Sequence, residues 1–150
     1  MTVGVKDLIK DFELEVVLEG VINHEITIND INRPGLQLAG FYNYFSKDRI
    51  QVIGMGEWSF LEELIPALRE KRVEKFMSYD IPCVIMTRGL EPQLELFEAA
   101  KRNKKWILRT KLSSTIFISR LTMYLSSALA PETRLHGTLV DIYGMGVFLT

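Results

Sequence analysis

The sequence contains few of the residues that form disulfides or transition-metal sites. It has one cysteine, Cys83, and two histidines, His24 and His136. A single cysteine excludes an intrachain disulfide and favours a reducing, cytoplasmic location. Two histidines and one cysteine cannot build a tetrahedral nitrogen–sulfur metal site without several carboxylates. A metal-stabilised domain is therefore not expected, and no residue of the chain is assigned as a metal ligand.

Long hydrophobic runs and a strong net charge are also missing. No apolar run approaches the ~20 residues that span a bilayer, and the start lacks the basic-then-apolar pattern of a signal peptide. The formal net charge is −1, which gives no electrostatic reason to expect nucleic acid or a membrane surface as a partner. With 47% hydrophobic and 25% charged residues over 150 positions, the composition is typical of a globular domain.

The hydrophobic pattern predicts strands that alternate with helices. Helical spacing predicts a helix over 4–12, and alternation at Leu14, Val16 and Leu18 predicts a half-buried strand. Further along we expect short strands at 25–28, 50–53, 81–86 and 106–108, and a turn at 29–35. A helix is expected at 59–70, with a Ser59/Glu62 capping box, and another with Pro92 in its first turn. The last helix is long and is capped by Ser113 or Ser114.

This order favours an α/β fold: a three-layer α/β/α domain over residues 1–130 with a mixed, largely parallel sheet. Residues 131–150 are expected to be a linker and a C-terminal β-hairpin stub. Two apolar runs there flank the tight turn Gly144-Met-Gly146.

One glycine-rich turn resembles a nucleotide-binding loop only superficially. Gly54-Met-Gly56 joins a predicted strand to a predicted helix. A dinucleotide site needs a third small residue where Ser59 stands, and Glu57 would place a carboxylate beside the pyrophosphate. A structural strand-to-helix turn is therefore favoured. Cys83 lies within an apolar run, where a thiol is usually an inert core residue.

Charged residues are unevenly distributed. Between Ala99 and Pro131 there is no acidic residue. The basic residues there are Lys101, Arg102, Lys104, Lys105, Arg109, Lys111 and Arg120. A solvated face is favoured, and a patch for an anion or an acidic partner is the alternative. Residues 62–75 carry charges of both signs, which indicates a hydrated helix surface.

Aromatic residues concentrate in the segment from Arg33 to Phe45. Phe41, Tyr42, Tyr44 and Phe45 lie close together in the sequence. So much aromatic area is more often core or interface than solvent-exposed. We expect this segment to be a candidate interface, together with Val147 and Phe148 of the hairpin; simple core packing is an equally good interpretation.

Four stretches, in the same order, resemble the amino-terminal part of HPr kinase/phosphorylase, a bacterial regulator of sugar uptake. They are Arg33-Pro-Gly-Leu-Gln-Leu-Ala-Gly-Phe-Tyr42, Ile53-Gly-Met-Gly-Glu57, Pro82 to Leu90 with Thr87-Arg-Gly-Leu90, and the segment from His136-Gly137 through the hairpin. The resemblance covers essentially the whole chain and ends just before the family's phosphate-binding loop.

The resemblance implies a parent enzyme that uses ATP and Mg²⁺ to phosphorylate a serine of the phosphocarrier HPr. It also implies removal of that phosphate by phosphorolysis and an oligomer, typically a hexamer. The family's phosphate-binding loop, catalytic aspartate and metal ligands match no position here, so a non-catalytic regulatory or assembly domain is expected. His136 alone lies in a motif near the family's phosphate site; a hydrogen-bonded residue at a strand start is favoured over a supporting catalytic role.

The alternative is a small α/β domain that binds a nucleotide or a sugar phosphate. The turn from Gly54 to Glu57 or the basic run near Lys104 would then hold the ligand, because ligands of open α/β sheets usually lie at the carboxyl ends of the strands.

Overall fold

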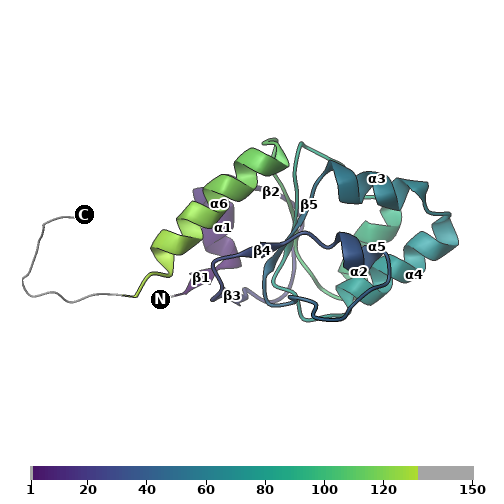
Figure 1. Ribbon diagram of the computed structural model, residues 1–150, viewed down its shortest axis with the longest axis horizontal. Coiled ribbons are helices and arrows are strands. Elements are labelled where there is room, and N and C mark those ends of the chain that lie inside the picture. Colours follow the sequence, from purple (N-terminus) through teal and green to yellow (C-terminus); the bar gives the residue numbers. More distant parts are fainter. Residues whose placement is uncertain (1, 132–150) are drawn as a thin grey trace, which may run out of the picture.

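The computed structural model describes residues 2–131, in which strands and helices alternate (Figure 1). The helices of this range are α1 (Val5–Asp11), α2 (Gly35–Leu38), α3 (Met55–Glu63), α4 (Pro66–Met77), α5 (Leu94–Arg102) and α6 (Ser114–Ala128). The strands are β1 (Val3–Gly4), β2 (Glu15–Leu18), β3 (Glu25–Ile26), β4 (Ile31–Asn32), β5 (Ile50–Ile53), β6 (Val84–Met86) and β7 (Ile107–Arg109).

Five of these strands form one mixed sheet in the order β2-β7-β6-β5-β4. β4, β5, β6 and β7 are parallel, and β2 pairs with β7 in the antiparallel direction. β1 and β3 form a separate antiparallel pair. The carboxyl ends of the parallel strands share one edge, so Arg33, Gly54, Thr87 and Thr110 follow four neighbouring strands there. The expected mixed, largely parallel sheet is confirmed.

Helices cover both faces of the sheet, as Figure 1 shows with α1 and α6 on one side and α3, α4 and α5 on the other. The buried residues divide accordingly. Leu8, Phe117 and Leu121 belong to a cluster that includes alternate residues of the central strands. Phe76 and Leu96 belong to a second cluster with the opposite strand positions. The predicted three-layer α/β/α domain is confirmed.

The predicted helix over 59–70 is wrong in its boundaries. α3 begins at Met55, and a break at Leu64 and Ile65 separates it from α4, whose first residue is Pro66. The capping interaction belongs to Glu57, whose carboxylate accepts a hydrogen bond from the Gly54 amide at 2.8 Å. Ser59 lies inside the helix. Proline fits the first helical position because its missing N–H would have no partner there.

The alternation expected in β2 is also wrong, because the pairing of β2 with β7 shifts register between Val16 and Leu18. Val16 is exposed, and Val17 and Leu18 pack against the second core cluster. Two short elements were missed here: β4 lies within the turn predicted at 29–35, and α2 begins at its last residue, Gly35. β4 is a strand because Asn32 pairs with Gln51, and its side-chain amide donates to Gln51 Oε1 at 2.7 Å.

The later elements follow the sequence prediction closely. Pro92 precedes α5 rather than lying in its first turn, since Gln93 is the N-cap. In α6 the cap is Ser113, whose hydroxyl accepts a hydrogen bond from the Ile116 amide at 3.3 Å. Its predicted apolar face is confirmed: Phe117, Leu121 and Leu125 are buried, with Tyr124 and Ala128 packed beside them.

Candidate functional site

The aromatic segment after β4 divides between the core and the surface. The Tyr42 ring stacks on Tyr79 with centroids 4.8 Å apart, and Phe45 meets Tyr79 edge-on at 5.1 Å. Phe45 also contacts Phe76 of the second core cluster. Two of the four aromatic residues named from the sequence therefore pack within the domain.

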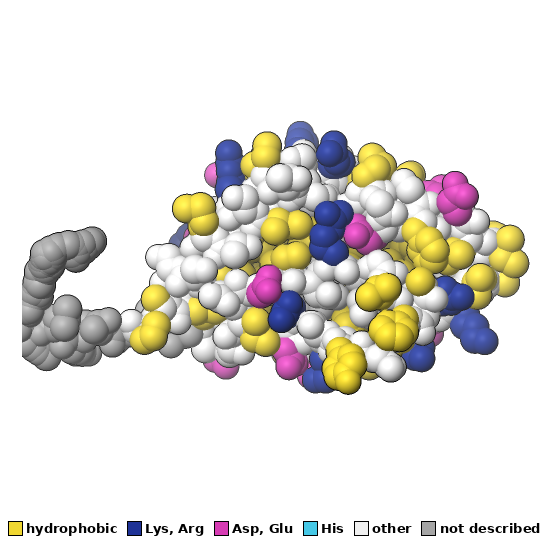
Figure 2. All heavy atoms as spheres, in the orientation of Figure 1, with side chains coloured by type: hydrophobic (Ala, Val, Ile, Leu, Met, Phe, Trp, Pro, Cys, Tyr) yellow, Lys and Arg dark blue, Asp and Glu magenta, His cyan; other side chains and the backbone are white. Residues whose placement is uncertain are grey.

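Phe41 and Tyr44 point outward instead. Tyr44 is 99% exposed and Phe41 is 49% exposed, and Leu36 of α2 is 62% exposed. The Phe41 amide donates to the Leu36 carbonyl at 2.9 Å, which keeps these two residues together. Figure 2 shows hydrophobic side chains on the surface around α2 and the segment that follows it. We call Leu36, Phe41 and Tyr44 the outer patch.

Tyr44 also has an unfavourable backbone conformation, with φ of +61°. In this left-handed region a residue with a Cβ is strained by roughly 1–2 kcal/mol, and glycine or asparagine is usual. A large aromatic residue that is fully exposed and also strained does not help this domain to fold. Such outliers concentrate at functional sites.

The carboxyl edge of the parallel strands, where ligands of this architecture usually bind, is filled by the protein's own side chains. Arg33 donates to Glu57 Oε1 at 3.0 Å, and that oxygen also accepts from the Gly54 amide. The hydroxyls of Thr87 and Ser114 lie 2.6 Å apart. A Cβ on Gly54 would lie 2.3 Å from Ser114 Oγ and 2.4 Å from Arg33 Nη2. The amide that a phosphate would need is thus already bonded to a carboxylate.

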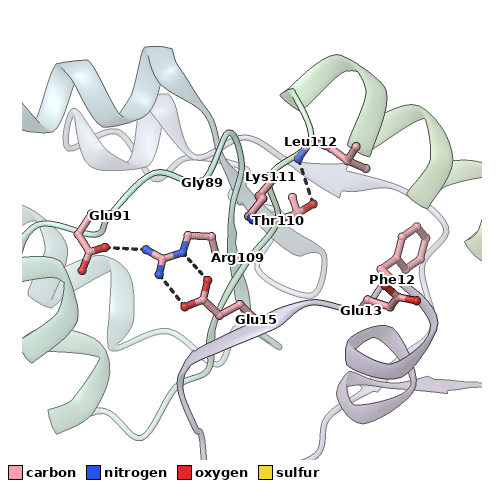
Figure 3. Close-up of a pocket in the computed structure, with 9 residues that line it drawn as sticks. All are labelled: Phe12, Glu13, Glu15, Gly89, Glu91, Arg109, Thr110, Lys111 and Leu112. Atoms are coloured by element: carbon pink, nitrogen blue, oxygen red, sulfur yellow. Dashed lines mark hydrogen bonds and ion pairs between the residues drawn. The ribbon is translucent and has the colours of Figure 1, made fainter.

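A pocket of about 470 Å³ lies nearby at the ends of β2 and β7 (Figure 3). Arg109 forms two hydrogen bonds to Glu15, at 2.7 and 3.0 Å, and one to Glu91 at 2.7 Å. The hydrogen bond from Arg109 holds the pKa of Glu15 below its usual range. With Glu13, three carboxylates line this pocket against two cations, Arg109 and Lys111. The arginine is already bonded to two carboxylates, so the pocket offers little to an anion.

The basic run seen in the sequence is partly neutralised by carboxylates from other segments. Arg102 forms an ion pair with Glu74 at 2.7 Å, and Lys105 lies 3.9 Å from Asp80. The sequence could not reveal this pairing, because the acidic partners precede the run by more than one secondary-structure element. The basic residues of the run without an ion pair in the described range are Lys101, Lys104, Lys111 and Arg120, all exposed.

A second cavity, of about 450 Å³, lies between the turn after α2 and helix α4. It is lined by Ala39, Gly40, Tyr42, Leu68, Lys71, Arg72 and Lys75. Three of these side chains are cationic and none is acidic. Sequence reasoning missed this cavity because residues 62–75 carry both signs. The tertiary structure separates these charges, because Arg69 forms an ion pair with Glu95 at 3.1 Å and Glu74 forms one with Arg102.

The residues considered for metal or thiol chemistry are placed elsewhere. Cys83 is fully buried, and burial raises the pKa of its thiol to about 12, in agreement with an inert core residue. His24 lies 3.4 Å from Asp80. In the part of the chain that the structure describes, no three His, Cys, Asp or Glu side chains are grouped to hold a metal ion.

His136, Val147, Phe148 and the predicted hairpin lie outside the described residues, so their assigned roles stay predictions. Within residues 2–131, no helix is both long and apolar enough to cross a bilayer.

Comparison with known proteins identifies the family of this chain. The family described as HPr Serine kinase N terminus matches residues 3–125. An HPr kinase/phosphorylase of Clostridium perfringens is 59% identical over all 150 residues, and those of Clostridium beijerinckii and Clostridium botulinum are 58% and 54% identical over the same length. A distant likeness, at TM-score 0.49 and 17% identity over 81% of this chain and 46% of the other, is to the CBS and DRTGG domains of a Clostridium perfringens pyrophosphatase.

The chain spans about half the length of the curated relatives that it matches, 49–50% in these three cases. The family match covers most of the chain and includes the sheet, the helices on both of its faces and both cavities. The resemblance noted in the sequence is therefore confirmed, and the chain belongs to the HPr serine kinase N-terminus family.

Proposed function

We propose that this chain is the non-catalytic amino-terminal domain of an HPr kinase/phosphorylase and that it serves in assembly of the enzyme. The parent would phosphorylate a serine of HPr and reverse the reaction by phosphorolysis, which the name HPr kinase/phosphorylase of its relatives and the name of the family support. We propose ATP and Mg²⁺ as its cofactors. Support comes from relatives that share this chain's full length and continue for as much again. The nucleotide, the metal and HPr are assigned to that further part of the parent.

The outer patch is the observation that carries the assembly role. Tyr44 is both strained and fully exposed, and Phe41 and Leu36 expose further apolar area in the same part of the chain. Tyrosine and phenylalanine are enriched in the buried centres of protein interfaces. Since much of the patch is left uncovered in the single domain, its occupant is taken to be a second copy of this chain in a homo-oligomer, a hexamer in the complete enzyme.

The structure shows which residues of this segment can be replaced without loss of core packing. Tyr42 is unsuitable, because its ring packs on Tyr79 and a variant without the ring would disturb the fold as well as any interface. We choose Phe41→Ser together with Tyr44→Asn, because asparagine tolerates positive φ. The matched control is Val21→Ser with Met123→Ser, two residues that are 68% and 72% exposed elsewhere. Light scattering on the wild-type chain should give a mass above that of the monomer.

The expected result is a smaller mass for the outer-patch variant and an unchanged mass for the control. Unchanged circular dichroism would show that both variants fold. A wild-type chain that stays monomeric at high concentration, or a patch variant with wild-type mass, would overturn the assembly role.

The non-catalytic part of the proposal has a separate test. Phosphoryl transfer requires positioned phosphate-binding groups, a lysine and a metal acting together. At the carboxyl edge the Gly54 amide is bonded to Glu57, which leaves it no role with a phosphate. Incubation of the purified chain with HPr, ATP and Mg²⁺ should give no phosphoserine, and a measurable rate free of contaminating kinase would contradict this.

A further inference from the structure

The cavity between α2 and α4 is lined by three cations that have no carboxylate partner in the described range. Lys71, Arg72 and Lys75 line it, and none of them forms an ion pair with any residue in the described range. Its volume of about 450 Å³ falls within the roughly 300–1,000 Å³ of small-molecule sites. Lys71 and Lys75 are four residues apart on one helix, where like charges destabilise the helix by a few tenths of a kcal/mol. No carboxylate among the residues that line the cavity offsets these positive charges.

Two of the charged residues of α4, Arg69 and Glu74, bind other parts of the fold, which distinguishes this cavity from an ordinary solvent-exposed helix surface. Arg69 is used within the fold, donating to the carbonyls of Leu61 and Leu64 at 2.7 and 2.9 Å. Glu74 accepts hydrogen bonds from Arg102 and Asn103 of the α5 end, and it is not among the residues that line the cavity. The remaining cations face a concave space that contains no carboxylate. In the Figure 3 pocket, by contrast, carboxylates already bind the arginine.

The walls hold part of this set in place. Arg72 Nη1 donates to the Leu38 carbonyl at 3.1 Å, which orients the guanidinium. Lys75 Nζ lies 4.6 Å from the centroid of the Tyr42 ring, and that ring is stacked on Tyr79. Opposite them, Gly40 has φ of +100° and no side chain; an added Cβ would lie 3.6 Å from Arg72 Cζ. Groups that are already ordered lose less entropy when a ligand binds.

We propose that this cavity binds a small phosphorylated molecule carrying at least two negative charges. Lys71 and Lys75 provide ammonium groups for phosphate oxygens, and Arg72 provides its free N–H groups, because hydrogen bonds between ionised partners are the strongest kind. The Tyr42 ring provides an apolar wall for the rest of the molecule. This goes beyond the assembly role and does not depend on it.

The test is titration calorimetry on the full 150-residue chain at constant ionic strength, with inorganic pyrophosphate and inorganic phosphate as probes. Pyrophosphate should bind to one site and more tightly than phosphate. Lys71→Gln with Lys75→Gln should weaken pyrophosphate binding by at least about tenfold, since two charge-assisted contacts are lost. The matched control is Lys6→Gln with Lys10→Gln, two exposed lysines at the same spacing on α1 without ion pairs in the described range. The control should change affinity by less than about twofold.

Two results would overturn the proposal. One is the absence of saturable pyrophosphate binding to the wild-type chain; the other is an equal loss of affinity in both double variants, which would mean general charge attraction. If the α4 double variant does not fold, Lys71→Gln alone should give a partial loss of affinity, and wild-type affinity in that variant would also overturn it. Oligomeric mass, measured on the same samples, reports on the assembly role separately.

Discussion

Tyr42 carries a buried hydroxyl that has no hydrogen-bond partner in the described part of the chain. Burial, followed by the neighbouring Tyr79, raises the pKa of this phenol above its usual value, so the hydroxyl remains a protonated donor without an acceptor. The ring itself is well packed on Tyr79 and Phe45. We therefore predict that Tyr42→Phe, which removes only the oxygen, increases the stability of the domain.

The size of the effect follows from two opposing contributions. An unsatisfied buried polar group costs about 1–3 kcal/mol relative to its hydrated state. Removing one oxygen gives up a few dispersion contacts of about 0.1–0.2 kcal/mol each. The free energy of unfolding of Tyr42→Phe should therefore rise by about 1 kcal/mol, or about 2–4 °C in the melting temperature of a domain this size.

Urea unfolding followed by the fluorescence of Trp58 and Trp106 measures this change as a higher midpoint with an unchanged slope. The matched control is Tyr124→Phe, because the Tyr124 hydroxyl donates to Asp11 Oδ2. Losing that bond should lower the free energy of unfolding by about 1 kcal/mol. The reasoning is refuted if Tyr42→Phe lowers the midpoint as Tyr124→Phe does, since that would mean the Tyr42 hydroxyl has a partner.

Three further predictions concern packing, thiol reactivity and acid stability. Gly20→Ala should lower the free energy of unfolding by about 1–3 kcal/mol or more, because a Cβ there would lie 2.4 Å from Cδ1 and 2.8 Å from the backbone nitrogen of Trp106; urea unfolding measures it. Cys83, buried with a thiol pKa of about 12, should not react with an aromatic disulfide reagent until the chain is unfolded. The lowered pKa of Glu15 contributes stability that is complete above the ordinary carboxyl pKa and is lost as pH falls through the lower folded value; melting temperatures at acidic pH should show this dependence, and Arg109→Gln should weaken it.

Each of these predictions has a control variant or a result that would contradict it. Gly56→Ala has nothing within 4 Å of the added Cβ and lies in α3, so it should stabilise the chain by about 0.4–1 kcal/mol. If Gly20→Ala did not lower the free energy of unfolding, the close approach of Gly20 to Trp106 would not restrict the side chain at this position, and the prediction would be wrong. Fast native-state labelling of Cys83 would contradict its burial. An acid profile that is identical in wild type and Arg109→Gln would mean that Glu15 contributes nothing.

The sequence predicted those parts of the fold that are specified by short, largely apolar segments. Residues 50–53 and 81–86 are buried, and short segments rich in Ile and Val are typical of covered strands in a parallel sheet. The boundaries around Pro66 and the strand β4 were missed for a physical reason. β4 has two residues, and its extended conformation depends on pairing with Gln51, which local composition does not encode.

The candidate sites were only partly predictable. Tyr42 and Tyr44 lie in a turn without helical or strand periodicity, so the side that each ring faces depends on the +61° φ of Tyr44. The charges of α4 are mixed in the sequence and separate only because Glu74 meets Arg102 of α5. Both the outer patch and the cation-lined cavity therefore require the tertiary structure before they can be recognised.

Tyr44 and the pair Lys71/Lys75 share one property: each introduces a local energetic cost in the isolated domain. The tyrosine is strained and exposed, and the lysines repel each other across one helical turn. The proposals made for them assume that a second copy of the chain or a bound anion offsets this cost. Tyr44→Asn and Lys71→Gln/Lys75→Gln should therefore leave the free energy of unfolding unchanged or raise it, while the first reduces oligomeric mass and the second reduces pyrophosphate affinity. A clear loss of stability in either variant would mean that these side chains stabilise the fold. Their strain and charge repulsion would then no longer point to a role in binding.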